Sequence, residues 1–271
     1  MNIDALSSSQ WLVVWLITSG LFGLAIGSFL NVIIWRIPNN LSILQPASHC
    51  PGCKEPISRF DNIPVVSYML LLGKCRNCAQ RISPRYPLIE ILCASVWVIT
   101  TWRLGLHVHT IGYALFFSGL IALGAIDIDT KLLPKKIVYP SGALLVGVLA
   151  LSSVGSGEYN RLRDAAIVGC AYSAFLGAVW FASGGRAMGF GDVRLAVWLG
   201  FAMGYYGYMV SYFGLLLSFF LGSVIGIAIA GISHGGRKMK IPFGPFLAAG
   251  TVIAIWLAPQ VHDFVSRTLN V

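Results

Sequence analysis

Long apolar runs constrain what this chain can fold into more than any other feature. Of its 271 residues, 56% are hydrophobic and only 11% are charged, whereas soluble domains carry about 25% charged residues. Many of the runs approach the ~20 residues that a helix needs to cross a bilayer. Lipid offers the backbone no hydrogen-bond partners, so a spanning segment has to satisfy its own N–H and C=O groups as a helix. The sequence therefore predicts an all-α integral membrane protein.

About eight of these runs are predicted to be transmembrane helices, and Trp and Tyr recur at their ends as interfacial anchors. The predicted spans are Trp11–Trp35, Leu88–Trp102, Thr110–Ile126, Ile137–Val154, Ala165–Ala182, Val193–Tyr205, Met209–Ile232 and Ile241–Ala258. The second and sixth runs are short for a span. The first run is too long for the apolar part of a signal peptide and has no basic residue before it, so we expect it to be retained.

The basic residues indicate how the helices are oriented. Most of the 19 Lys and Arg residues fall in the segments after the first, third, fifth and seventh runs. Positive charge accumulates on the cytoplasmic side of membrane proteins, so we expect these segments in the cytoplasm and both termini outside. Because the basic residues are spread along short loops, we expect no nucleic-acid partner; attraction to anionic lipid headgroups is a secondary expectation.

The predicted organisation has four parts. Residues 1–35 form the first transmembrane helix, 36–87 a cytoplasmic loop, 88–260 a helical bundle in the membrane, and 261–271 a short extracytoplasmic tail.

The loop of residues 36–87 carries two Cys-x2-Cys pairs, which are Cys50 with Cys53 and Cys75 with Cys78. Two such pairs can complete a tetrahedral Zn²⁺ site, and a set of four thiolates leaves no open position, as in structural sites. The reducing cytoplasm disfavours disulfides as the alternative. A segment of this size has little core of its own, so bound metal would supply folding energy. The other interpretation is four unconnected thiols.

Two aspartates stand where apolar residues are expected. Asp127 lies at the end of the third run and Asp192 at the start of the sixth, both on the side predicted to be cytoplasmic. Ionisable groups at membrane depth are costly and usually functional. Two facing carboxylates retain one proton between them, which suits general acid–base hydrolysis by a water molecule. We assign that proton to Asp127, because the start of a helix favours the anion at Asp192.

The residues around this pair have further interpretations. Gly189 and Gly191 are predicted to let a substrate backbone approach closely and to adopt dihedrals that other residues resist. The alternative is that Asp192 only caps a helix and Asp127 only ends one. Asp129 is expected to be solvated, or paired with Lys131 or Lys135.

Five segments with the cysteine pairs resemble the type IV prepilin peptidases, which are bifunctional leader peptidase/N-methyltransferases of the bacterial inner membrane. The similarity covers roughly residues 20–250, and its segments are "GSFLNVIIWRIP" (Gly27–Pro38), "RYPLIEIL" (Arg85–Leu92), "IDIDTKLLP" (Ile126–Pro134), "GFGDVRL" (Gly189–Leu195) and "IPFGPFLAAG" (Ile241–Gly250). The resemblance implies that Asp127 and Asp192 cleave prepilins or pseudopilins at a Gly–Phe-type junction on the cytoplasmic side. It also implies N-methylation of the new terminus with S-adenosylmethionine.

Several positions keep more than one interpretation. Lys135 stands where the family commonly has aspartate, which could alter substrate preference, and Arg194 stands where it commonly has lysine. Glu90 is a weak candidate for cofactor binding, with a structural role as the alternative. Gly27, Ser28 and Asn31 fit a helix-packing face with one polar cross-link, with a direct role in the chemistry as the alternative.

Two other functions compete with leader cleavage. A presenilin-like intramembrane protease would share Gly-x-Gly-Asp, but the predicted zinc-binding loop argues against it. A transporter or non-catalytic assembly scaffold would use the aspartates as ion-binding groups. Clients from a pilus, a type II secretion system or a competence pilus are all compatible with the sequence, as is any oligomeric state.

Overall fold

The computed structural model describes residues 3–186, 188–232 and 242–269, and the chain divides into two compact units, Met1–Leu106 and His107–Val271. In the described residues the regular elements are helices, and the β-type pairing consists of two isolated bridges in the cysteine-containing loop. This confirms the predicted all-α class. The division into four parts stays a prediction.

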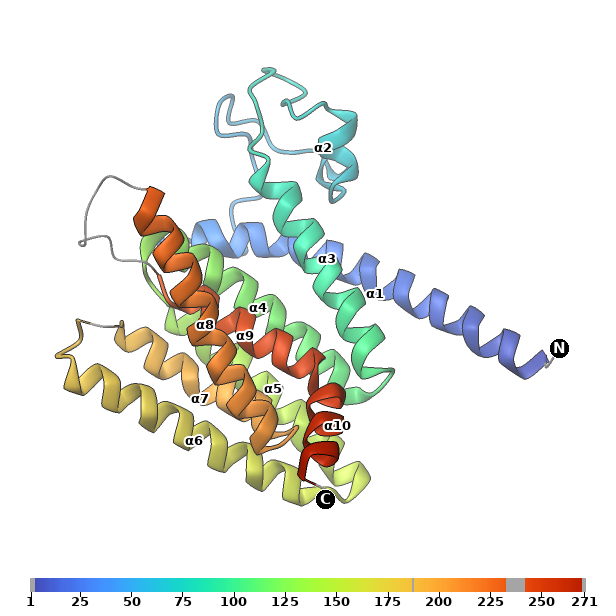
Figure 1. Cartoon of the computed structure of the whole chain (residues 1–271). Helices are drawn as coiled ribbons and strands as arrows, with labels where there is room; N and C mark the ends of the chain where they lie inside the picture. Colours follow the sequence, from blue (N-terminus) through green and yellow to red (C-terminus); the bar gives the residue numbers. More distant parts are fainter. Residues whose placement is uncertain (1–2, 187, 233–241, 270–271) are drawn as a thin grey trace. The chain divides into compact units, whose positions relative to one another are not determined.

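The first unit is built on two long helices, α1 (Ile3–Arg36) and α3 (Arg85–Leu104), joined by a loop with a 3-10 turn, η1 (Arg59–Asn62), and the short α2 (Val66–Leu70). Figure 1 shows α3 running against α1. Glycines on α1 allow the contact, since a Cβ on Gly27 would lie 2.7 Å from the Cα of Glu90. Asn31 adds a hydrogen bond from Nδ2 to the carbonyl oxygen of Tyr86 (3.2 Å), and Ser19 Oγ lies 2.7 Å from Thr101 Oγ1, so the packing face is present with more polar cross-links than the one predicted.

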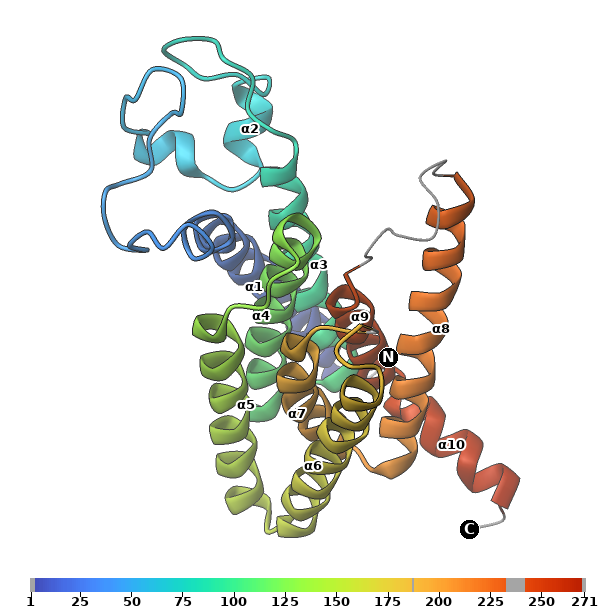
Figure 2. The same ribbon diagram turned by 90° about the vertical axis from the view of Figure 1, so that its left-hand side faces the viewer.

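The described part of the second unit contains seven helices, and α4 is the most enclosed of those long enough to span a membrane. Figures 1 and 2 show the set, which is α4 (Val108–Thr130), α5 (Lys135–Ser156), α6 (Tyr159–Ala182), α7 (Phe190–Gly204), α8 (Tyr208–Ile232), α9 (Gly244–Trp256) and α10 (Ala258–Leu269). The side chains of Phe116, Phe117 and Ile126 on α4 are fully buried. By contrast, α8 presents large apolar side chains such as Tyr212 and Phe220 on its exposed face, as expected of a lipid-facing helix.

Helices α6 and α7 lie side by side in both views because glycines remove side chains from the contact (Figures 1 and 2). A Cβ on Gly200 of α7 would lie 2.8 Å from the carbonyl oxygen of Val168, and one on Gly204 would lie 2.8 Å from the Cα of Ala165. Small residues at this spacing let two helices in a membrane approach closely. The packing fixes α7, which carries Asp192 in its first turn.

Six described helices are long and apolar enough to span a membrane, or up to seven segments if the bent pair α9 and α10 counts as one. The six are α1 from Trp11, α3, α4, α5, α6 and α8 up to Ile229. The prediction of about eight spans is therefore approximate. Helix α7 has 15 residues and α9 has 13, which at 1.5 Å per residue is shorter than a hydrocarbon core of about 30 Å. After α9 the chain bends by 66° into α10.

Candidate functional site

Asp127 lies in the last turn of α4, and its carboxylate is held by the start of a distant helix. Only 5% of the residue is exposed. Its Oδ2 accepts a hydrogen bond from the backbone N–H of Gly244, the first residue of α9, at 3.1 Å. The first N–H groups of a helix have no partner within that helix, so they are available to a carboxylate. The interpretation that Asp127 merely ends a helix accounts for its position in α4 and leaves this bond unexplained.

Asp192 lies in the first turn of α7 and is held by its own turn. It is 6% exposed. Its Oδ2 accepts the backbone N–H of Gly189 at 3.1 Å, while its own N–H donates to the carbonyl oxygen of Gly189. Asp192 therefore does cap a helix, as the structural interpretation holds. Its second oxygen, Oδ1, is buried and has no hydrogen-bond partner in the described part of the chain. A buried oxygen of this kind costs free energy unless a ligand or water occupies it.

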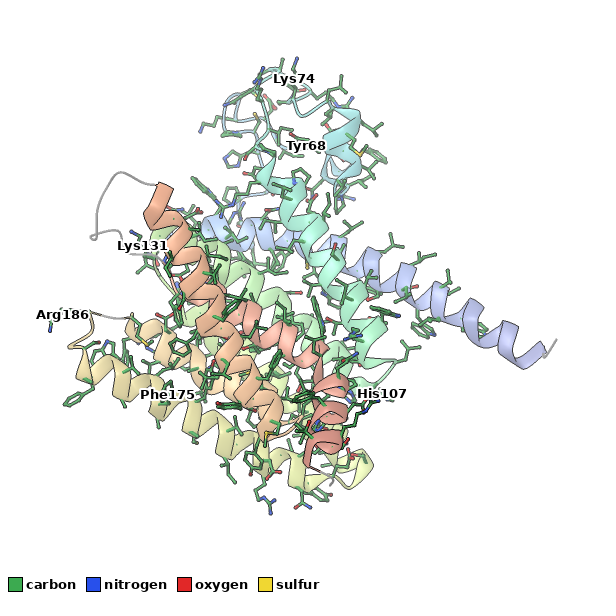
Figure 3. All side chains as sticks on the ribbon, viewed as in Figure 1. Tyr68, Lys74, His107, Lys131, Phe175 and Arg186 are labelled. Carbon is green, nitrogen blue, oxygen red and sulfur yellow. The ribbon has the colours of Figure 1, made fainter. Side chains whose placement is uncertain are left out.

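The two aspartates lie at the same end of the second unit, because Leu133 contacts both the position before Asp192 and Gly244, which holds Asp127. Figure 3 shows Lys131, which follows α4, and Arg186, which precedes α7, at one end of this unit, with His107 toward the other. Asp129, two residues from Asp127, is exposed, as expected. The bundle thus brings together Asp127 and Asp192, and it keeps Asp129 at the surface.

The glycines around Asp192 do not have unusual dihedrals, so this part of the prediction is wrong. Gly189 has φ −78° and ψ 151°, and Gly191 is helical, which are conformations open to any residue. The requirement at Gly191 is space: a Cβ there would lie 3.0 Å from the Cβ of Leu133. At Gly189 the nearest atom to an added Cβ would be Oδ2 of Asp192 at 3.5 Å, an ordinary contact. Close approach of a substrate backbone to either glycine stays a prediction.

Two residues of this site were not singled out by the sequence. Gly244 holds Asp127, and Leu133 packs between the first turns of α7 and α9. The segment "IPFGPFLAAG" indicated a proline-broken helix entry that could shape the site, and α9 does begin there with Pro245 in its first turn. Ile241, where this predicted span begins, lies outside the described residues. No local signal connects Gly244 to Asp127, since 117 positions separate them.

The four loop cysteines come together in the first unit. Their sulfur atoms all lie within 4.8 Å of one another. The two pairs have the same backbone geometry: the N–H of Cys50 donates to Glu55 O and the N–H of Cys75 to Gln80 O, each carbonyl five residues later. The residue after each second cysteine, Lys54 or Ala79, has a positive φ. Two matching turns that aim four thiols at one point fit a metal such as zinc.

The thiols influence one another's protonation. The pKa of Cys50 is lowered to about 6, chiefly because the backbone N–H groups of Cys53 and Gly52 donate to its sulfur. At Cys53 the backbone N–H of Glu55 acts in the lowering direction, but desolvation and the neighbouring thiols outweigh it and raise the pKa to about 11. Four thiolates this close repel one another, and a divalent cation removes that repulsion. His49 beside the cluster is exposed, and its Nδ1 lies 3.2 Å from Ala47 O, consistent with a surface residue.

Glu90 on α3 is buried and anchors the loop of the first unit. Its Oε2 accepts the backbone N–H of Val65 at 2.7 Å, and Val65 itself has φ +61°, a conformation that β-branched residues rarely adopt. A shallow, open apolar depression of about 480 Å³ lies beside this contact, with Leu24, Ile91 and Val98 among its lining residues. An aliphatic lining does not fit a charged cofactor such as S-adenosylmethionine. A cofactor role for Glu90 stays a prediction.

The two departures from the family pattern lie at the starts of α5 and α7. Lys135 is the exposed first residue of α5. Arg194, in the first turns of α7, places its guanidinium carbon 4.8 Å from the ring centroid of Phe190, which fits a cation–π contact. An effect of Lys135 on substrate preference stays a prediction.

Two known families match most of the chain. Residues 21–104 match the family described as "Bacterial Peptidase A24 N-terminal domain", and residues 114–231 match the "Type IV leader peptidase family". The chain is similar to a protein of Pseudomonas putida named "Prepilin leader peptidase/N-methyltransferase", with 34% identity over 86% of this chain and 88% of that protein. Proteins with the same name from Aeromonas salmonicida (34% identical, covering 91% of each chain) and Neisseria gonorrhoeae (31%, covering 93% of this chain and 92% of that one) are also similar. No solved structure matches the chain.

Proposed function

This chain belongs to the type IV leader peptidase family, and from that membership we propose that Asp127 and Asp192 are the catalytic pair that cleaves prepilin leaders. The chain is a prepilin leader peptidase that also N-methylates the new terminus of its product. The six apolar helices fit a multi-pass protein of the inner membrane. Its substrates are prepilins, and pseudopilins of a type II secretion system are further candidate clients.

The observation that carries the catalytic proposal is the free oxygen of Asp192. One carboxylate oxygen of each aspartate is occupied by a glycine N–H, and Oδ1 of Asp192 has no partner among the described residues. A carboxylate held on one oxygen and open on the other can accept a proton from an attacking water. The facing carboxyl group, in its protonated form, can donate to the carbonyl oxygen of the scissile bond.

The geometry does not distinguish which aspartate keeps the proton. Both carboxylates accept one backbone N–H at the start of a helix, Asp127 from α9 and Asp192 from α7. The assignment of the proton to Asp127 therefore stays a prediction. The site is proposed to face the cytoplasm, on the basis of the basic residues that follow α4 and α6.

The fit of the four cysteines to a metal supports a zinc ion with a structural role. The two matching turns would hold the ion through Cys50, Cys53, Cys75 and Cys78, and all four positions of a tetrahedral site would be filled. Bound zinc would supply folding energy to a loop with few buried apolar residues. The name of the relatives implies S-adenosylmethionine as the methyl donor, and no residue of this chain is assigned to it beyond the candidate Glu90.

Mass spectrometry of a prepilin incubated with the purified chain tests the function. The wild type should remove the leader and then add one methyl group. Asp127→Asn and Asp192→Asn should each lower the rate of cleavage by about 10³-fold or more, since each removes one half of an acid–base pair. Asp129→Asn, an exposed neighbour, should cleave within a few-fold of wild type.

The outcomes separate the possible errors. A folded wild type that leaves the prepilin intact would contradict leader cleavage and favour the transporter or scaffold. Full activity in Asp192→Asn would exclude the aspartate pair while leaving the family assignment in place. Cleavage without the added methyl group would show a peptidase that lacks the second activity.

A further inference from the structure

Leu133 lies at the point where the surroundings of the two aspartates meet. It belongs to the short link between α4 and α5, and its side chain is half-buried. A Cβ added to Gly191 would lie 3.2 Å from Cδ1 of Leu133, and a Cβ added to Gly244 would lie 3.4 Å from its Cδ2. One methyl group of Leu133 therefore packs on the first turn of α7, and the other packs on the first turn of α9.

The turn of α7 carries the carboxylate of Asp192, and the turn of α9 binds the carboxylate of Asp127, which belongs to α4. Gly191 directly precedes Asp192, and the position of a Cβ on Gly244 is 2.7 Å from Oδ2 of Asp127. The isobutyl group of Leu133 thus lies between the residue that precedes Asp192 and the residue that holds Asp127. Both ends of the link are held: the N–H of Lys131 donates to Asp127 O at 2.9 Å, and Pro134 directly precedes α5 and accepts the N–H of Ile137 at 3.0 Å.

We propose that Leu133 determines which residue is accepted next to the scissile bond. This inference rests on the proposed function. A peptide whose scissile bond reaches both aspartates has to pass the turns of α7 and α9, where Gly189, Gly191 and Gly244 present no side chains. Leu133 stands between those turns and supplies an apolar surface there. The substrate residue on that side of the bond packs against the isobutyl group, which limits its size.

The size of the effect follows from the volume of the side chain. One methylene in an apolar subsite changes discrimination by about 10- to 200-fold. Leu133→Ala removes three carbon atoms, so the preference for a large over a small flanking residue should change by at least about 10-fold. Leu133→Phe should change it in the opposite direction.

The test measures kcat/KM on two series of prepilin variants with the purified full-length chain. One series carries Gly, Ala, Leu or Phe immediately before the cleaved bond, and the other carries the same residues immediately after it. In one of the two series, Leu133→Ala should raise the ratio of kcat/KM for the large residue over the small one. Leu132→Ala, at the exposed neighbouring leucine, is the matched control and should leave both ratios unchanged.

A purely structural leucine gives a different result. Leu133→Ala would then slow every substrate by one common factor, and unchanged ratios in both series would overturn the proposal. If the alanine variant does not fold, Leu133→Val is measured in the same assay, and a smaller change in the ratio of kcat/KM values is expected. Absence of cleavage by the wild type would instead contradict the proposed function.

Discussion

Replacing Gly244 with alanine should disturb Asp127 without removing any hydrogen-bonding group. The added Cβ would lie 2.7 Å from Oδ2 of Asp127, closer than real Cβ contacts, so the carboxylate has to withdraw by a few tenths of an ångström. The N–H of Gly244 now donates to that oxygen at 3.1 Å, and this withdrawal brings the pair toward the limit of a hydrogen bond. Alanine in a helical position before Pro245 adds a clash with the proline ring.

The expected loss can be worked from that hydrogen bond. A hydrogen bond to a charged group contributes about 1.5–3 kcal/mol, and about 1.4 kcal/mol corresponds to a tenfold change. Weakening or losing the bond should therefore lower kcat/KM for prepilin cleavage by about 10- to 100-fold. The assay is leader removal from a purified prepilin by the chain in lipid nanodiscs, with initial rates read by mass spectrometry.

Gly189→Ala is the matched control, because Gly189 donates the equivalent hydrogen bond to Asp192. Its added Cβ would meet Oδ2 of Asp192 at 3.5 Å, which is ordinary contact, and its dihedrals suit alanine. Activity should stay within about threefold of wild type, a change of less than 1 kcal/mol. Equal losses in the two variants would refute the steric reasoning, as would a fully active Gly244→Ala.

Two further predictions concern the metal and the helix packing. Cys75→Ser should lower the zinc content of the purified chain well below that of wild type, as measured by elemental analysis, and should speed proteolysis within residues 36–87. The control, Cys93→Ser, should retain the metal. Unchanged zinc in the Cys75 variant would exclude the tetracysteine site. In Gly147→Ala the added Cβ meets no atom within 4 Å, so the free energy of unfolding should rise by up to ~1 kcal/mol. In Gly200→Ala the added Cβ would meet a backbone oxygen at 2.8 Å, so the free energy of unfolding should fall by about 1–3 kcal/mol. Thermal midpoints that move in the same direction in both variants would contradict this packing.

Local patterns predicted the helices and the cysteine cluster. The number of spans also depends on where helices begin and bend, which composition does not show. The cysteines could be placed because each Cys-x2-Cys turn is local and only two turns have to meet. The predicted span Ile241–Ala258 was less accurate, because an apolar run does not show where a helix begins or where the chain bends. The chain begins α9 only at Gly244 and bends by 66° after Trp256, so the described segment of α9 is shorter than a bilayer.

The two aspartates show most clearly where prediction from the sequence ends. Asp192 is held by Gly189, three residues before it, and a glycine followed by an acidic residue at the start of a helix is a pattern that can be read locally. Asp127 is held by Gly244, 117 positions away, through a contact that exists only once α9 has packed against α4. The hydrogen bonds of the two aspartates should therefore also respond differently to mutation. Changes that shift α9 should move the partner of Asp127 and leave that of Asp192 in place, so the alignment of the pair depends chiefly on the packing of α9.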